Sequence, residues 1–226
     1  MLEMFERLAR VYGPQDGWWP AESAFEVAVG AVLTQATAWR NAQMAISELK
    51  RRGLLTAAVI RGMAQEDVAD VIKPAGFQQR KALTLKGLSE MLAEFGDDLS
   101  GAEGVDTCSL RRRLLAVHGV GEETADAILL YALGRSTFVA DGYARRLFSR
   151  LGLVPDGWSY AECREYAMSS APMNAGDWAE LHALIVHHGA STCRSAPACK
   201  GCPLLGMCPT GQAALSGSTP ARRPLR

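Results

Sequence analysis

Four of the six cysteines in this 226-residue chain lie within sixteen residues near its C-terminus. They are Cys193, Cys199, Cys202 and Cys208, with the spacing C-x5-C-x2-C-x5-C. In a reducing compartment such a concentration of thiols favours a metal site over disulfide bonds. Structural zinc is usually bound by two close cysteine pairs, whereas this loop has one close pair with a single cysteine on each side. The pattern favours a [4Fe–4S] cluster, which takes four cysteine ligands. Zinc and disulfides remain as alternatives.

The rest of the chain has the pattern of an all-α protein. Helical spacing or good helix formers recur along it, and Gly or Pro residues separate the helical segments. No segment alternates apolar and polar residues for long enough to predict a strand. The expected helices span residues 2–12, 23–37, 39–51, 78–95, 108–117, 124–134, 142–152, 159–169 and 177–188.

Several local patterns add detail to this expectation. Segment 23–37 is apolar nearly all round, which predicts a central, buried helix. Cys108 and Cys163 each lie alone in a helical pattern, so both are expected to be buried as small hydrophobic residues. The last sixteen residues, 211–226, are small, polar and proline-containing, which indicates a disordered tail.

Composition and charge narrow the class of protein. Hydrophobic residues make up 48% of the chain, which is enough for a buried core. The 24 basic and 24 acidic residues balance, so bulk charge gives no support for a nucleic-acid binder. The longest apolar stretch, 24–33, is too short to cross a bilayer, and the first ten residues show no signal peptide. We expect a soluble intracellular protein.

A helical hairpin is predicted within residues 114–133. Gly119 and Gly121 permit a tight turn, and the helix that follows begins with unpaired backbone N–H groups that could bind a phosphate. An ordinary αα-hairpin would give the same pattern. Twenty residues beyond Gly121, Asp141 precedes another predicted helix and is well suited to cap it. Taken singly, each feature has a purely structural explanation.

Hairpin, aspartate and four-cysteine loop, in this order, resemble the helix-hairpin-helix DNA glycosylases of the endonuclease III type. The resemblance runs over roughly residues 1–210. The family motif L-P-G-V-G-x-K-T-A corresponds to V-H-G-V-G-E-E-T-A at 117–125, and V-D-T-H corresponds to A-D-G-Y at 140–143. The first gap between cysteines is one residue shorter here than in the family.

The resemblance implies two lobes with DNA in the cleft between them. A six-helix barrel would span 22–132, with the helix-hairpin-helix at 109–133. A second lobe would join 1–21 to 133–210 and hold the [4Fe–4S] cluster. Double-stranded DNA with a damaged base would be the partner of a monomeric protein that is not bound to membranes. The location would be cytoplasmic, and nucleoid-associated in a bacterium.

The resemblance also assigns roles to single residues. Asp141 would be the catalytic carboxylate, and Gly119, Gly121 and Thr124 would contact DNA. In bifunctional members the hairpin lysine attacks the sugar and forms a Schiff base, but the matching residue here is Glu123. Because a carboxylate cannot form an imine, lyase activity is expected to be absent or trivial.

A closer likeness is to the 3-methyladenine DNA glycosylase III branch. It rests on G-W-W-P at 17–20, G-A-V-L-T-Q-A-T at 30–37, the Gly-Phe pair at 76–77 and E-T-A-D-A-I-L-L-Y-A at 123–132. In that branch, tryptophans matching Trp18 and Trp19, with an aromatic matching Trp39, stack on the alkylated base. Gln35 would fill the space that the base leaves, and Phe77 would enter the opposite strand. Packing of both tryptophans, and a core position for Phe77, are the structural alternatives.

The sequence therefore predicts a monofunctional DNA glycosylase that excises alkylated purines, above all 3-methyladenine. One alternative is an endonuclease III-like glycosylase for oxidised pyrimidines with weak or no lyase activity. The other is a damage-binding iron–sulfur protein without catalysis.

Overall fold

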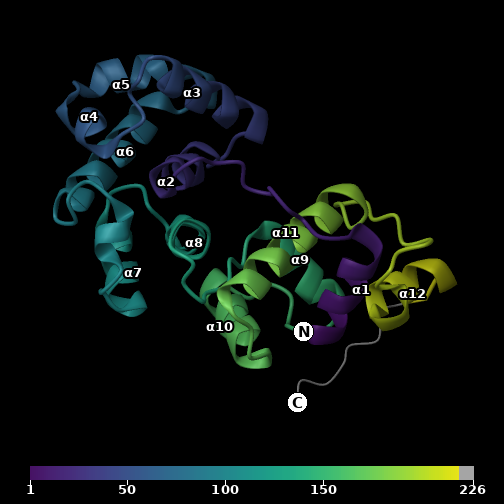
Figure 1. Ribbon diagram of the computed structural model, residues 1–226. Helices are drawn as coiled ribbons and strands as arrows, with labels where there is room; N and C mark the ends of the chain where they lie inside the picture. Colours follow the sequence, from purple (N-terminus) through teal and green to yellow (C-terminus); the bar gives the residue numbers. More distant parts are fainter. Residues whose placement is uncertain (219–226) are drawn as a thin grey trace. The chain divides into compact units, whose positions relative to one another are not determined.

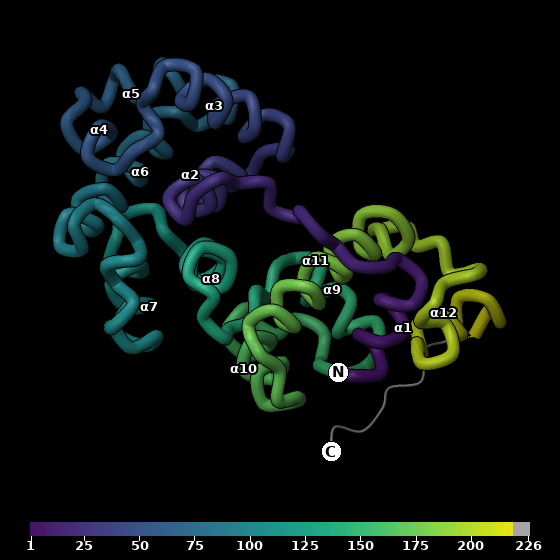
Figure 2. Tube along the Cα trace, in the orientation of Figure 1, coloured from purple at the N-terminus to yellow at the C-terminus, as the bar shows by residue number. Residues whose placement is uncertain are grey.

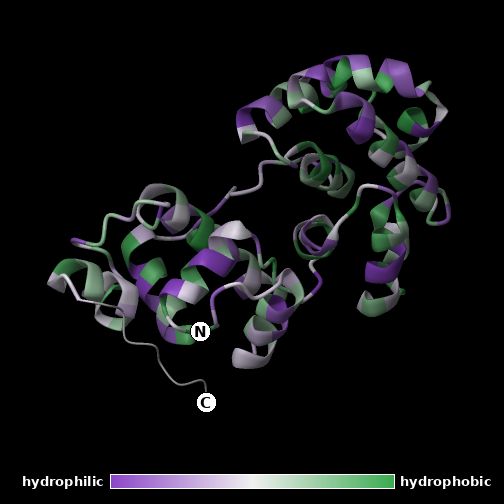
Figure 3. Ribbon diagram, turned by 180° about the vertical axis from the view of Figure 1, so that it is seen from behind, coloured by the Kyte–Doolittle hydropathy of each residue, from purple (hydrophilic) through white to green (hydrophobic). Residues whose placement is uncertain are grey.

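The computed structural model describes residues 1–218, which form helices joined by turns, with no strand among them (Figure 1). The predicted all-α class is confirmed. Many of the helices carry both hydrophilic and hydrophobic residues, as expected for amphipathic helices that pack one face on a core (Figure 3). None of the helices within 1–218 has both the length and the apolar character that a bilayer crossing needs.

The chain divides into two compact units. One is continuous and spans Trp19–Arg135, and the other joins Met1–Trp18 to Ser136–Arg226. Both boundaries lie three residues from the expected ones. The six-helix barrel and the DNA cleft remain predictions.

The Trp19–Arg135 unit is built around α2 (Ala24–Leu33), nine of whose ten residues are buried. Ser23 caps the helix by accepting a hydrogen bond from the backbone N–H of Glu26, and α3, α6 and α8 pack against it. The expected central helix is confirmed, but it ends at Leu33 rather than at residue 37. The unit also contains α3 (Trp39–Arg51), α4 (Ala57–Gly62), α5 (Gln65–Val71), η1 (Lys73–Ala75), α6 (Gln78–Ala93), η2 (Leu99–Ala102), α7 (Thr107–Ala116), α8 (Glu122–Ala127) and the π-helical turn η3 (Ile128–Ala132).

The second unit joins the N-terminal helix to helices from the C-terminal half of the chain. Helix α1 (Leu2–Tyr12) packs against α11 (Ala175–Ser191) although more than 160 residues separate them in the sequence (Figure 2). A buried aromatic group of Phe138, Phe148 and Trp178 forms part of the core, with ring centroids 5.4–5.7 Å apart. The remaining helices are α9 (Gly142–Arg150), α10 (Tyr160–Ser170), η4 (Leu205–Met207) and α12 (Pro209–Ser216).

Helix α12 corrects the prediction of a disordered tail over 211–226. Pro209 opens the helix, and its fixed φ suits that position. The side chain of Cys208 accepts a hydrogen bond from the backbone N–H of Gly211, and Ala213 is buried. The small residues that suggested disorder allow this helix to pack closely. Residues 219–226 lie outside the described part of the chain.

Candidate active site and cysteine loop

The predicted hairpin is present as α7, the turn 117–121 and α8. Gly119 has φ +85°, and a Cβ atom added there would lie 2.1 Å from Oγ1 of Thr84, so the turn requires glycine. The side-chain amide of Gln35 donates to the carbonyl of Gly119 at 3.1 Å and to Oγ1 of Thr124 at 2.8 Å. Gly121 precedes α8 with φ −90° and has open space around it. The structure thus brings Gln35 together with the hairpin residues.

A partly buried ion pair braces the hairpin. The guanidinium of Arg111 on α7 donates to the buried carboxylate of Asp126 on α8 at 2.9 and 3.0 Å, and to Glu122 at 3.3 Å. These hydrogen bonds raise the pKa of Arg111. Glu123, at the position of the family's lysine, is exposed in the acidic first turn of α8. The ion pair therefore fixes α7 and α8 relative to each other. The position of the family's nucleophilic lysine is occupied by the carboxylate of Glu123.

Three aromatic side chains of the same unit form a cluster, in which Trp19 packs against α2. The ring of Trp19 is 6.0 Å from that of Trp39 in an edge-on arrangement and 5.0 Å from that of Tyr131. A Cβ on Gly30 would approach Trp19 Nε1 to 3.2 Å, so this glycine gives the indole close access to α2. Trp39 remains 36% exposed. Trp19 and Trp39 come together as predicted.

The third aromatic of the cluster is Tyr131, which sequence reasoning did not select as a site residue. Its only signal is its place in the segment 123–132 that resembles the 3-methyladenine branch. Trp18, predicted as a member, is exposed and belongs to the Met1–Trp18 segment of the other unit.

Phe77 stands out by its backbone and its exposure. It precedes α6 in the left-handed region, with φ +47°, and 61% of it is exposed. A core position for Phe77, the structural alternative, is therefore wrong. Such a conformation is strained for a bulky residue and often marks a functional position.

Asp141 caps α9, as its position in the sequence predicts. Its Oδ1 accepts a hydrogen bond from the backbone N–H of Ala144 at 2.8 Å. The side chain is 13% exposed, and its Oδ2 lies 3.9 Å from Nε2 of the buried His182. Burial raises the pKa of Asp141 to about 6 and lowers that of His182 to about 4. At neutral pH a poorly solvated carboxylate thus faces a neutral imidazole. His182 has no sequence signal of its own, because it lies within an ordinary helical pattern.

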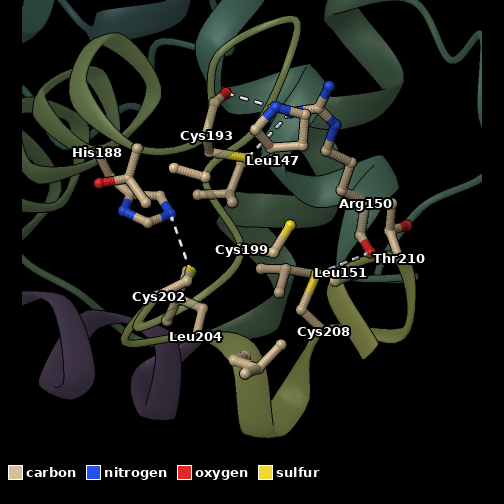
Figure 4. Close-up of a pocket in the computed structure, with 15 residues that line it drawn as sticks. Leu147, Arg150, Leu151, His188, Cys193, Cys199, Cys202, Leu204, Cys208 and Thr210 are labelled. Atoms are coloured by element: carbon tan, nitrogen blue, oxygen red, sulfur yellow. Dashed lines mark hydrogen bonds between the residues drawn. The ribbon is translucent and has the colours of Figure 1, made fainter. Parts of the chain in front are cut away.

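The four predicted cysteines line one cavity, with the buried His188 and mainly apolar neighbours such as Leu147 and Leu204 (Figure 4). A Cβ on Gly211 would approach Cδ1 of Leu205 to 3.2 Å and would be in ordinary van der Waals contact with the sulfurs of Cys208 and Cys199, at 3.5 and 3.7 Å. Within residues 1–218, His, Cys, Asp and Glu side chains form no group of three that could hold a metal ion. A [4Fe–4S] cluster does not need its ligands to converge on one ion, because each of the four thiols binds a different iron, and four thiols around an apolar cavity are a donor set that fits it.

Two further residues hold the cysteines in place. Arg150, in the last turn of α9, donates to the sulfur and to the carbonyl of Cys193, both at 3.2 Å. His188 Nε2 lies 3.8 Å from the sulfur of Cys202, and its Nδ1 is hydrogen-bonded to the hydroxyl of Tyr12 at 2.8 Å. Burial raises the pKa values of the Cys202 and Cys208 thiols.

The two remaining cysteines have different surroundings. Cys163 is buried, as expected, but Cys108 is exposed. The prediction for Cys108 was wrong because Cys108 lies in the first turn of α7, two residues after the capping residue Asp106, where the helix faces solvent.

These features belong to one class of protein, the DNA glycosylases. The chain is a member of the HhH-GPD superfamily of base excision DNA repair proteins, whose profile matches residues 29–173. A protein of Methanocaldococcus jannaschii that is named as a DNA repair glycosylase is 41% identical over 92% of this chain and 95% of its own length.

Solved structures show the same fold. A trapped covalent complex of endonuclease III with DNA has a TM-score of 0.79 at 22% identity, covering 93% of this chain and 95% of the other. The Helicobacter pylori 3-methyladenine DNA glycosylase MagIII, bound to 1,N6-ethenoadenine, has a TM-score of 0.70 at 26% identity. That likeness covers 83% of this chain and 96% of the other. The protein is therefore a DNA glycosylase of the endonuclease III-like HhH-GPD family.

Proposed function

We propose that this glycosylase is monofunctional and releases alkylated purines, with 3-methyladenine as its first substrate. The observation that carries the proposal is the cluster of Trp19, Trp39 and Tyr131, with one tryptophan face left partly exposed. The exposed carboxylate of Glu123 at the position of the family's lysine supports the monofunctional part. The monomeric state and the cytoplasmic location remain predictions.

The aromatic cluster suits a cationic base. Purines alkylated on a ring nitrogen carry a positive charge, and each aromatic face attracts a flat cation by roughly 0.5–2 kcal/mol. The charge also weakens the N-glycosidic bond, so such an enzyme needs recognition more than activation of the leaving base. Flipping the nucleotide out of the duplex costs a few kcal/mol. Gln35 would offset part of this cost by entering the space that the base leaves, and Phe77 would do so by entering the opposite strand.

Asp141 supplies the chemistry in this proposal. As the bond between base and sugar breaks, positive charge develops on the sugar ring, and a poorly solvated carboxylate stabilises it strongly. The same carboxylate accepts a proton from the water that adds to the sugar. His182 stays neutral at working pH, because its pKa is lowered to about 4, so it does not neutralise the carboxylate.

The four cysteines of the loop would hold a [4Fe–4S] cluster. When bound, the cluster would cross-link the segment 193–208, which contains little regular structure of its own. Arg150 and the pair His188–Tyr12 would then fix the ligands from α9, α11 and α1.

The proposal predicts a specific pattern of products. Duplexes that contain 3-methyladenine should lose the free base, and strands should break at the product site only after alkali. Borohydride should trap no covalent adduct, because Glu123 offers no amine. Base release is measured by chromatography and strand breakage on denaturing gels.

Matched duplexes with oxidised pyrimidines and with undamaged DNA serve as controls. Preferential release of an oxidised pyrimidine would support the endonuclease III-like alternative instead. Tight binding of damaged DNA without any base release would support the damage-binding alternative. Efficient trapping by borohydride would contradict the monofunctional proposal.

Replacing the exposed aromatic should change recognition rather than chemistry. Trp39→Ala is expected to weaken discrimination between alkylated and normal purines by roughly 1–3 kcal/mol, the value of one stacking face. Trp39→Phe should retain most of this discrimination, because it keeps an aromatic ring. The measurement is the ratio of kcat/KM for a 3-methyladenine duplex to that for an undamaged one. Unchanged discrimination in Trp39→Ala would remove this residue from the base pocket.

A further inference from the structure

Lys81, on α6, is buried and binds two backbone carbonyls. Its ammonium group donates to the carbonyl of Leu33 and to that of Ala75, both at 2.8 Å, and only 3% of the residue is exposed. Burial lowers the pKa of Lys81. Hydrogen bonds from a charged donor are roughly twice as strong as neutral ones. The two contacts therefore fix two distant backbone segments to α6.

Both carbonyls lie at the ends of helical elements. Leu33 is the last residue of α2, where carbonyls have no partner within the helix and the helix dipole favours a cation. Ala75 is the last residue of η1. Two residues after each carbonyl come Gln35 and Phe77, the two residues assigned to the space inside the duplex.

The segments beyond these carbonyls leave the helices through unusual backbone conformations. Ala36 and Phe77 have φ +50° and +47°, in the region that residues with a side chain rarely occupy. The backbone N–H of Lys81 also donates to the carbonyl of Phe77 at 3.0 Å. Strained backbone persists only where its surroundings hold it, and the ammonium group of Lys81 binds the carbonyl that immediately precedes each segment.

We propose that Lys81 is a positioning residue that holds Gln35 and Phe77 in the arrangement needed to open the DNA duplex. The inference rests on the proposed function for the roles of these two residues. It adds that one buried ammonium group couples the segment after α2 to the segment before α6, so that both side chains act on DNA together.

The same helix offers a matched control. The ammonium group of Lys86 also donates to two carbonyls, those of Arg61 and Met63, at 2.8 and 2.5 Å. These carbonyls lie at the end of α4, away from both Gln35 and Phe77 in the sequence. Lys81→Met and Lys86→Met each remove a similar pair of hydrogen bonds, but only the first releases the proposed DNA-opening segments.

The experiment measures duplex opening without any excision step. The probes are a duplex with a tetrahydrofuran abasic analogue, used for binding, and one with 2-aminopurine opposite the lesion, used for fluorescence. Lys81→Met should weaken binding of the abasic-analogue duplex by about tenfold relative to undamaged DNA and lose the 2-aminopurine signal. Lys86→Met should stay within about twofold of the unmodified protein in binding, even where its melting temperature falls equally.

Two further variants test the coupling. Lys81→Gln keeps one amide donor and should give an intermediate loss, which preserves the test if Lys81→Met does not fold. In a Gln35→Ala/Phe77→Ala background, Lys81→Met should cause no additional loss of binding. Equal effects of Lys81→Met and Lys86→Met, or an undiminished effect of Lys81→Met in that background, would overturn the inference.

The outcome is distinct from that of the proposed function. If the unmodified protein releases a different damaged base but shows this pattern of binding and fluorescence, the proposed substrate fails and the role of Lys81 stands. If it binds the abasic-analogue duplex without a 2-aminopurine signal, the inference about Lys81 fails, whatever base is excised.

Discussion

Asp141→Asn is expected to lower the single-turnover rate of base excision by about 10²–10³, the effect of removing one well-placed electrostatic group. The amide oxygen can still accept the hydrogen bond from the backbone N–H of Ala144, so the cap of α9 should survive. Binding of damaged DNA should be retained or tightened, because a negative charge is removed. The measurements are single-turnover base release and a binding titration on the same duplex.

The pKa of Asp141 gives this variant a second signature. Folding raises this pKa from 3.8 to about 6. Between these two pH values, Asp141 is therefore protonated to a larger extent in the folded state than in the unfolded chain. Each pKa unit corresponds to about 1.4 kcal/mol, so ionised Asp141 lowers the free energy of unfolding by about 3 kcal/mol at pH 7. Stability from this group is thus greatest below pH 4 and is lost as the pH rises through 6.

Asp141→Asn should therefore melt at a higher temperature than the unmodified protein at pH 7, with the difference shrinking toward pH 4. The excision rate of the unmodified protein should rise with pH through about 6 and then level off, because only the carboxylate is active. Asp106 provides the control, since it caps α7 in the same way but is exposed and has a lowered pKa. Asp106→Asn should show neither the loss of rate nor the gain in melting temperature. Normal excision by Asp141→Asn would leave Asp141 as a helix cap only.

Long helices with a clear apolar face could be predicted from the sequence, and short ones could not. α1 and α3 were expected with their observed bounds. α4 and α5 have six and seven residues, fewer than two turns, so their periodicity is too short to recognise. α12 was missed because its small residues lack an apolar stripe, and packing beside the cysteine loop stabilises it. Tertiary contacts, rather than local propensity, form such helices.

The residues of the candidate site also differ in whether the sequence alone points to them. Residues carried by a motif, such as Asp141, Gln35 and Gly119, were selected as candidates from the sequence, and their roles remain proposals. Tyr131 and Lys81 were not, because their roles depend on what lies beside them in space. A lysine in a helix ordinarily keeps its charged end in water, and nothing in the local sequence shows that the ammonium group of Lys81 reaches carbonyls on two other elements.

The largest structural effect is expected at the cysteine loop. The purified protein should contain about four irons per chain and be yellow-brown, as a [4Fe–4S] protein is. Cys202→Ser should reduce the iron content to a small fraction of this and unfold the segment 193–208, because ligation there is also folding energy. Iron and acid-labile sulfide are measured chemically, and local unfolding by limited proteolysis.

Cys108→Ser is the matched control, because this cysteine is exposed on α7 in the other unit and lines no part of the cavity. It should keep the full iron content and the protease resistance of the unmodified protein. One zinc and no iron per chain would contradict the cluster but keep a metal site, with Cys202→Ser still unfolding the loop. Full iron content in Cys202→Ser would show that this sulfur is not a ligand. The contact of Cys202 with His188 would then be a packing contact within an apolar cavity.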